Sequence, residues 1–193
     1  MRAKESLVVK FLIENSFREL NILSISKALK MDYKTAYSII KRLENISVVR
    51  LESFGHSRRV KLNLVVHPLL FEAEFERRKE ILRDKNLAVM LRNFKRGIKS
   101  KSYVLLLFGS YAKKTYNKNS DIDLMFICPT GLENNLEKDV NKVASSMPLP
   151  IHHYVFSESQ FLDMINAKEP NVGQEALQNN IILCGIEQYY EMM

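Results

Sequence analysis

Two aspartates one residue apart are the part of the sequence best suited to chemistry. Asp121 and Asp123 open the run DIDLMFI, which is otherwise apolar and reads as a buried strand. On a strand, side chains two positions apart share a face, so both carboxylates point to the same side. Carboxylates this close repel each other and raise the pKa of one member unless a positive charge lies between them. A divalent cation meets that need, and Mg²⁺ or Mn²⁺, held by a few carboxylate oxygens together with substrate phosphates, is the expected ion.

The turn before the aspartates supplies groups that bind anions. Residues 107–110 read LFGS, and Lys113 follows one helical turn later. Gly109 lets the backbone approach a ligand closely, and the N–H groups at the start of the following helix favour an anion. Ser110 adds a hydroxyl and Lys113 adds a positive charge. A phosphate cradle beside a metal-binding pair of aspartates is the equipment of phosphoryl or nucleotidyl transfer.

Two strands and a short helix must hold these groups in place. Residues 103–108 (YVLLLF) are short, apolar and bounded by turn signals, which predicts a buried strand. The Gly-Ser turn leads into a short helix over 111–116, and residues 121–127 form the second strand. On that second strand, the face opposite the aspartates is predicted to point into the core and carries Ile122, Leu124 and Phe126.

The stretch GSYAKKTYNKNSDIDL resembles the signature of the polymerase-beta-type nucleotidyltransferase superfamily, in its small stand-alone branch. That signature is an apolar strand, Gly-Ser, a basic loop, and Ser-Asp-x-Asp followed by apolar residues. The resemblance runs over about residues 87–186, and its later part predicts a helix at 132–146, a strand at 151–156 and the closing QEALQNNIILCG. The two motifs occur together at this spacing, each beside a predicted strand, which makes the resemblance specific.

The resemblance implies a role for each residue of the motif. Asp121 and Asp123 would bind the metal and align the triphosphate of an NTP, with ATP as the first expectation. Gly109 and Ser110 would hold the phosphates, and Lys113 stands where the small branch commonly has an arginine, which keeps the charge but loses the planar fork. A hydroxyl on a protein, a nucleic acid or a small molecule would attack the α-phosphate and expel pyrophosphate. In the small branch, partners are often helical proteins of toxin–antitoxin type.

One position departs from the family pattern. The family usually places a third carboxylate on the next strand, here PLPIHHYVF, and the matching position is His152 with His153 beside it. Histidine could serve as the base, because its pKa suits neutral pH. The site could instead bind a nucleotide with one metal and not turn it over, or it could be a relic. Ordinary strand residues are the plainer interpretation of the histidine pair, and Glu158 and Asp163 beyond the strand are interpreted as structural.

The first third of the chain predicts a compact run of helices. Residues 5–15 place Leu7, Val8, Phe11 and Leu12 on one helical face. A short helix follows, capped by Ser24 or Ser26, and Lys30-Met31-Asp32 forms a tight turn. Asp32 caps a further helix over 33–44. The buried face of that helix is predicted to carry Ala36, Ile39, Ile40 and Leu43.

Two alternating strands, 48–51 and 60–64, follow these helices, with a basic turn over 54–58 between them. Helix, helix, turn, helix and hairpin is the order of a winged helix-turn-helix, which residues 1–66 resemble. The resemblance implies that Tyr33–Arg42 enters the DNA major groove while the wing lies near the backbone, so DNA is bound through residues 24–60. A winged helix used for protein contacts is the alternative. The predicted DNA-binding residues are Lys34, Thr35, Tyr37, Ser38, Lys41, Arg42 and Arg58.

The whole chain is therefore predicted to be α+β, with an N-terminal winged helix-turn-helix followed by a polymerase-beta-like nucleotidyltransferase α/β domain with a small mixed sheet. The domains are residues 1–66, a bridge over 67–96 made of one long helix or two and closed by Gly97, and the nucleotidyltransferase-like part over 87–193. The bridge run ERRKE is interpreted as a solvated face.

Charge is distributed unevenly along the 193 residues. Residues 1–65 carry a net charge of +7, residues 66–118 carry +8, and residues 119–193 carry −8. A basic front part favours a polyanionic partner, nucleic acid or nucleotide. The two cysteines lie far apart without metal-ligand spacing, and no apolar run reaches the length of a membrane span, so a reducing cytoplasmic setting without a membrane is expected.

Two functions follow, both compatible with a winged helix. The first is a DNA-binding protein whose second domain binds NTP and Mg²⁺ and transfers a nucleoside monophosphate to a hydroxyl. The alternative is a transcriptional regulator whose catalytically impaired nucleotidyltransferase domain only senses a nucleotide or mediates assembly, and the absent third carboxylate favours it. A winged helix that merely docks a nucleic-acid substrate is a third possibility. Because winged-helix proteins are frequently dimers, a homodimer is expected.

Overall fold

A computed structural model describes residues 2–55, 57–117, 120–148 and 150–193. The chain divides into two compact units, residues 1–76 and residues 77–192. The division falls inside the helix α4 (Pro68–Ile81), and each unit is described below by itself. No helix in the described ranges is long and apolar enough to cross a membrane.

The first unit begins with three helices, α1 (Arg2–Glu14), α2 (Ile22–Ala28) and α3 (Tyr33–Asn45). Asp32 caps α3 as predicted, because its side chain accepts from the Thr35 N–H at 2.8 Å. The four residues predicted for its inner face are all buried. Between α2 and α3, Lys30 takes a positive φ of 50°, which lets the chain reverse within a few residues.

Two predictions for these helices are wrong. Neither Ser24 nor Ser26 is the cap of α2. Asn21 accepts from the Ser24 N–H, and the Ser24 hydroxyl accepts from the Asn21 N–H, so the serine is the third helical residue of a reciprocal capping box. Leu7, predicted on the inner face of α1, is 45% exposed, because Val9 takes the inward position beside Val8 and Leu12.

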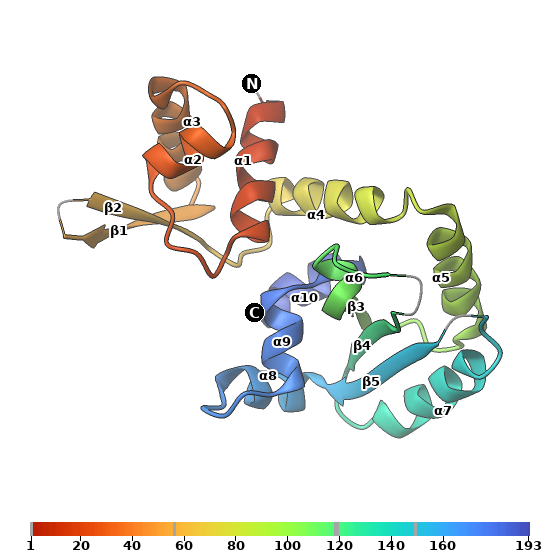
Figure 1. Cartoon of the computed structure of the whole chain (residues 1–193). Helices are drawn as coiled ribbons and strands as arrows, with labels where there is room; N and C mark the ends of the chain where they lie inside the picture. The colour runs from red at the N-terminus through yellow and green to blue at the C-terminus, as the bar shows by residue number, and fades with distance from the viewer. Residues whose placement is uncertain (1, 56, 118–119, 149) are drawn as a thin grey trace. The chain divides into compact units, whose positions relative to one another are not determined.

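An antiparallel hairpin completes the first unit. β1 (Val49–Phe54) pairs with β2 (Ser57–Leu62), and both strands run further into the connecting turn than the sequence predicts. The N–H of Val60 donates to Leu20 O at 2.7 Å, so the segment before α2 adds a third short pairing to the hairpin. The basic tip includes His56, which lies outside the described residues. Three helices followed by a hairpin give the winged helix-turn-helix arrangement (Figure 1).

The predicted bridge is two helices rather than one, α4 (Pro68–Ile81) and α5 (Lys85–Gly97). Asp84 separates them by capping α5, accepting from the N–H groups of Asn86 and Leu87. Gly97 is the last residue of α5 but does not end it through a left-handed conformation. Its missing side chain instead makes room for Val143, whose Cγ2 lies 2.7 Å from where a Cβ would stand.

The second unit is built on a four-stranded mixed sheet with the order β5-β4-β3-β6. The strands are β3 (Val104–Phe108), β4 (Ile122–Cys128), β5 (Ile151–Ser157) and β6 (Ile181–Cys184). β3 runs antiparallel to both of its neighbours, whereas β4 and β5 are parallel. The predicted small mixed sheet is therefore present, with β3 and β4 at its centre. All five residues of β3 and six of the seven in β4 are buried.

Helices cover both faces of this sheet (Figure 1). α5 and α7 (Glu133–Ala144) pack with Leu124 and Phe126 in one hydrophobic core. α8 (Glu158–Asn166) contacts β4 and β5, while α9 (Val172–Gln178) and α10 (Ile186–Met192) contact β3. The short α6 (Gly109–Ala112) links β3 to the loop before β4, and Lys118 and Asn119 of that loop lie outside the described residues.

Candidate functional site

The sheet brings the Gly-Ser turn against the second aspartate. β3 and β4 pair with Phe108 opposite Asp123, so Gly109 follows directly beside that carboxylate. A side chain at position 109 would collide with it, since the Cγ of Asp123 lies 2.9 Å from where a Cβ would stand. Gly109 also has φ +65°, a conformation that favours glycine. Glycine at 109 and aspartate at 123 thus fit each other, as their joint occurrence in the sequence suggests.

Asp123 is partly buried, and its side chain is 25% exposed. Burial raises the pKa of its carboxyl, the charge of His152 opposes that shift, and the negative charges of Glu175 and Asp121 add to it. The influence of Asp121 agrees with the prediction that the two aspartates lie close together. Asp121 itself is exposed and precedes β4 rather than belonging to it, because the strand begins at Ile122.

His152 lies next to Asp123 across the parallel pair β4–β5. The two residues are register partners, and His152 Nδ1 is 3.9 Å from Asp123 Oδ1. Its side chain is 67% exposed, which leaves the ring accessible at the sheet's edge. His153 points elsewhere and contacts Asn141 Oδ1 through Nε2 at 2.9 Å, an arrangement within the fold. His152, the position that matches the family's third carboxylate, thus lies beside Asp123.

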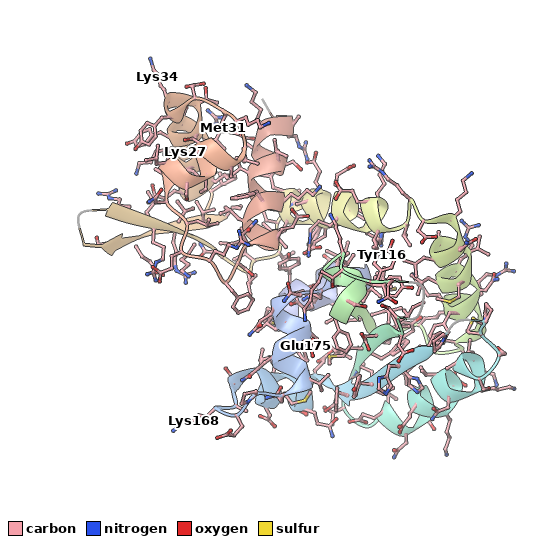
Figure 2. All side chains as sticks on the ribbon, in the orientation of Figure 1. Lys27, Met31, Lys34, Tyr116, Lys168 and Glu175 are labelled. Carbon is pink, nitrogen blue, oxygen red and sulfur yellow. The ribbon has the colours of Figure 1, made fainter. Side chains whose placement is uncertain are left out.

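A third carboxylate approaches from a helix that the sequence reasoning did not use. Glu175 of α9, labelled in Figure 2, accepts from Lys113 Nζ at 2.9 Å. Both side chains are substantially exposed. Because Lys113 follows the Gly-Ser turn, this ion pair places Glu175 at the edge of the candidate phosphate site. The only signal in the sequence was an acidic residue inside the closing QEALQNNIILCG, and nothing local connected it to a turn 62 positions earlier.

The aspartates have the chemistry to take a hard cation. Both supply carboxylate oxygens, and within the described part of the chain the Asp123 carboxylate accepts no side-chain hydrogen bond, since His152 Nδ1 stays 3.9 Å away. Across the described ranges, no three His, Cys, Asp or Glu side chains converge as a ready-made metal cluster. Mg²⁺ suits such a place, because it commonly takes one or two carboxylates and completes its shell with water and substrate phosphates.

A second candidate site covers the outer face of α3 in the first unit. Lys34, Tyr37 and Ser38 are exposed, and Lys34 extends from the helix into solvent (Figure 2). Tyr37 stacks with Tyr33 at a ring separation of 6.4 Å, giving the helix an exposed aromatic pair. Arg58 is exposed on β2 near the tip of the hairpin. These four predicted DNA-binding residues are therefore accessible.

The other predicted cations of α3 are engaged within the protein. Lys41 Nζ lies 2.6 Å from Glu44 Oε2, and Arg42 Nε lies 2.7 Å from Glu5 Oε1 of α1. Arg42 also donates to the Ser38 hydroxyl at 3.1 Å. A hollow of about 230 Å³ on this face is lined by Lys4, Thr35, Ser38, Ile39 and Arg42. It unites three predicted residues and adds Lys4, which the sequence reasoning did not single out.

Comparison with known families identifies the second unit. Residues 91–174 match the family model described as a nucleotidyltransferase domain, a span that includes the Gly-Ser turn and both aspartates. The second unit is therefore similar to a nucleotidyltransferase domain over these residues, and the first unit has the element order of a winged helix-turn-helix. Both parts of the predicted fold class are confirmed.

Comparison with whole proteins adds two distant structural similarities. One is to the crystal structure of MepR, a transcription regulator of the Staphylococcus aureus multidrug efflux pump MepA, at 14% identity and a TM-score of 0.35, covering 48% of this chain and 74% of that one. The other is to TrmBL2, an archaeal chromatin protein, at 16% identity and a TM-score of 0.23, covering 85% and 75%. The chain has no significant match among curated protein sequences.

Proposed function

We propose that this protein couples DNA binding by its winged helix to the binding of an NTP with Mg²⁺ by its nucleotidyltransferase domain. The observation that carries the nucleotide half is the fit of Gly109 against Asp123, in a segment that matches the nucleotidyltransferase family. A backbone free of side chain beside a carboxylate leaves room for phosphate and metal together. The DNA half is supported by the exposed Lys34, Tyr37 and Ser38 of α3.

Each residue of the site has a part in holding the nucleotide. Asp121 and Asp123 would hold Mg²⁺, which neutralises phosphate charge and orients the triphosphate. The N–H groups that open α6 have no acceptor inside the helix, so Gly109 and Ser110 can donate to phosphate oxygens. Lys113 would exchange Glu175 for a phosphate, since an incoming triphosphate competes for the same ammonium group. ATP is the first nucleotide to test.

Transfer to a hydroxyl acceptor requires a group that accepts its proton. Two candidates flank Asp123, namely His152 at 3.9 Å and Glu175, whose charge acts on the same carboxyl. Glu175 supports a catalytic site, because α9 would supply the third carboxylate that β5 lacks. The acceptor hydroxyl would belong to a protein, a nucleic acid or a small molecule, with a helical protein of toxin–antitoxin type as one candidate.

The second candidate function is a regulator that senses a nucleotide without turning it over. The observation that favours it is the third position on β5, where an exposed histidine replaces the acid. In this case nucleotide binding would change DNA affinity, and no pyrophosphate would be released. Either function suits a cytoplasmic protein, since Cys128 and Cys184 are both free thiols. A homodimer is part of this proposal, and sedimentation would test it.

The deciding experiment is calorimetric titration of ATP and the other NTPs, with Mg²⁺, into the wild type and Asp121→Asn/Asp123→Asn. Metal-dependent binding should be lost in the double variant and kept in the control Asp163→Asn, which removes an exposed acid from α8. Binding that survives in the double variant with an unchanged metal requirement would refute the assignment.

Pyrophosphate release separates the two functions once binding is established. Incubation with acceptor-containing extract and labelled ATP should give metal-dependent release if the protein is a transferase. His152→Ala and Glu175→Gln would then show which side chain is required. Nucleotide-dependent DNA affinity without any release would establish the sensing function.

A further inference from the structure

A basic cavity lies in the second unit, apart from the aspartates. It has a volume of about 570 Å³ and is bounded by the end of α4, the outer side of α5 and β6. Five of its lining residues are cationic: Arg78, Arg92, Lys95, Arg96 and Lys101. None of the residues that line it carries a negative charge. So many like charges around one hollow repel each other unless an anion joins them.

Four of the five cations that line the cavity lack the compensation that surface cations usually have. Across the described residues, Arg92, Lys95, Arg96 and Lys101 form no ion pair with any carboxylate. Lys95 Nζ donates to Leu183 O at 3.4 Å, and Arg78 Nη1 donates to the same oxygen at 3.2 Å. Two cations therefore converge on one neutral carbonyl at the edge of the sheet.

The floor of the cavity is apolar and is formed by Leu82, Ala88, Leu91 and Leu183. Leu91 and Leu183 are buried members of the hydrophobic core, so the floor is a fixed surface. The cavity therefore combines an apolar patch with a set of cations in its lining. A ligand that fits must have a flat or apolar body and several negative charges.

The cavity and the aspartate site lie on different faces of the sheet. Leu183 belongs to the core under α5, together with Leu124 and Phe126. Asp123 alternates with Leu124 along β4, so its side chain points to the opposite face. No residue of the Gly-Ser turn, and neither aspartate, lines the cavity. It is therefore not an extension of the nucleotide site proposed above.

We propose that this cavity is a second, metal-independent binding site for a nucleoside polyphosphate. The base would lie on the apolar floor, and the phosphates would be bound by Arg92 and Arg96, which are neighbours on one face of α5. Guanidinium groups suit this task because they bind phosphate through two parallel hydrogen bonds. A nucleic-acid strand fits less well, because the cations surround one hollow rather than following a line along the surface.

The test uses the full chain with Asp121→Asn/Asp123→Asn, in EDTA, so that failure of the first site does not affect the result. ATP should bind with one-to-one stoichiometry by calorimetry, and more tightly than inorganic tripolyphosphate, which has no base. Adding Arg92→Gln/Arg96→Gln should weaken ATP binding at least about tenfold, because each arginine supplies charge-assisted hydrogen bonds. The matched control Lys85→Gln/Lys99→Gln removes two charges near the ends of α5 but outside the cavity and should leave binding unchanged.

Several results would overturn the proposal. One is the absence of metal-free ATP binding, and another is an equal weakening of binding by the control pair. A third is equal affinity for ATP and tripolyphosphate, which would mean that the base does not contact the apolar floor. Displacement of ATP by a short single-stranded oligothymidine at lower concentration would assign the cavity to a nucleic-acid strand instead. All four substituted residues are exposed, and thermal unfolding of each variant checks that the fold is kept.

Discussion

The helices α3 and α5 are built alike but differ in how their charges are balanced. Each has 13 residues, an aspartate cap and four buried apolar residues on one face. The last turn of α3 carries Arg42, and the last turn of α5 carries Lys95 and Arg96. On α3, Lys41 and Arg42 are paired with Glu44 and Glu5. On α5, the described structure gives Arg92, Lys95 and Arg96 no carboxylate partner.

This difference shows that a count of cations along a helix does not locate the site of an anion. A phosphate that binds Arg42 must first displace Glu5, whereas Arg92 has no carboxylate partner within the described residues. The deciding residues lie on other elements, Glu5 on α1 and Leu183 on β6. The cations of α3 are thus more restrained by ion pairs than those of α5, although α3 is the helix that the sequence predicts to bind DNA.

The largest effect is expected when one large side chain is removed from the buried apolar face of each helix. Phe94→Ala on α5 should lower the stability of its surroundings by about 3–5 kcal/mol, and Ile40→Ala on α3 by about 2–5 kcal/mol, because both side chains are fully buried. Hydrogen exchange at the amides of each helix measures both. Wild-type protection in either variant would mean that the helix does not depend on this core.

The next effect concerns DNA. Lys41→Gln/Arg42→Gln should weaken DNA binding at least about tenfold and lower the slope of log affinity against log salt by about 0.9 for each phosphate that the variant no longer neutralises. Fluorescence anisotropy of labelled duplex DNA over a range of salt concentrations measures both quantities. Arg18→Gln, which removes an exposed charge between α1 and α2, is the control and should change neither.

A companion variant sharpens the comparison of the two helices. Glu5→Gln releases Arg42 from its ion pair and should tighten DNA binding, because the arginine no longer has to leave a carboxylate. If Glu5→Gln weakens binding instead, the pair orients Arg42 for DNA rather than restraining it. If the salt slope is unchanged in Lys41→Gln/Arg42→Gln, these residues of α3 do not contact the DNA phosphates.

A smaller effect is expected from the caps. Asp84→Ala should destabilise α5 by about 1 kcal/mol, because two N–H groups lose their acceptor. Asp32→Ala should act in the same direction on α3, where a single N–H of Thr35 is capped. Asn at either position keeps an oxygen that can accept these hydrogen bonds, so it should lose less stability than Ala and serves as the comparison. Hydrogen exchange at the amides of the first helical turn measures the effect. Unchanged protection of these amides in the alanine variants would contradict the prediction.

The smallest effect is a response of α3 to acid. Hydrogen bonds from Thr35, first its side chain and then its backbone N–H, lower the pKa of Asp32. A lowered folded-state pKa means that the ionised form stabilises the fold above the ordinary pKa of an aspartate, and that this contribution is lost as the pH falls through the folded value. Asp32→Asn should therefore be less stable than wild type at neutral pH, with the difference vanishing in acid. A difference that stays constant with pH would contradict this.

Local signals account for what the sequence predicted well. Asp32 stands directly before a run with helical spacing, so its role as a cap could be predicted from the sequence. The cap of α2 was misplaced because three candidates occur within a few residues, and only the fold chooses Asn21. α5 ends at Gly97 as predicted, but the reason for a glycine there depends on Val143, which lies on another helix.

The same distinction applies to the sites. Gly109 and Asp123 could be predicted together, because β3 and β4 are consecutive strands that pair with each other, and Gly109 directly follows the first. Glu175 could not, since it reaches Lys113 from a helix far along the chain. The cavity beside α5 was equally hidden, because Leu183 completes it from a strand far along the chain. A site formed by two consecutive strands can be predicted from the sequence. A site formed by elements that are far apart in the chain cannot.

The place of β6 in the sheet has a consequence for how the protein is made. β3 (Val104–Phe108) needs β6 (Ile181–Cys184) on one side, and Arg77 donates to the backbone oxygen of Asn180 just before that strand. A ribosome releases the wholly apolar β3 well before it has synthesised β6. During that interval the nascent chain presents an open strand edge, which is a template for aggregation. Chains stalled before residue 181 should therefore depend on chaperones, whereas completed chains close the sheet themselves.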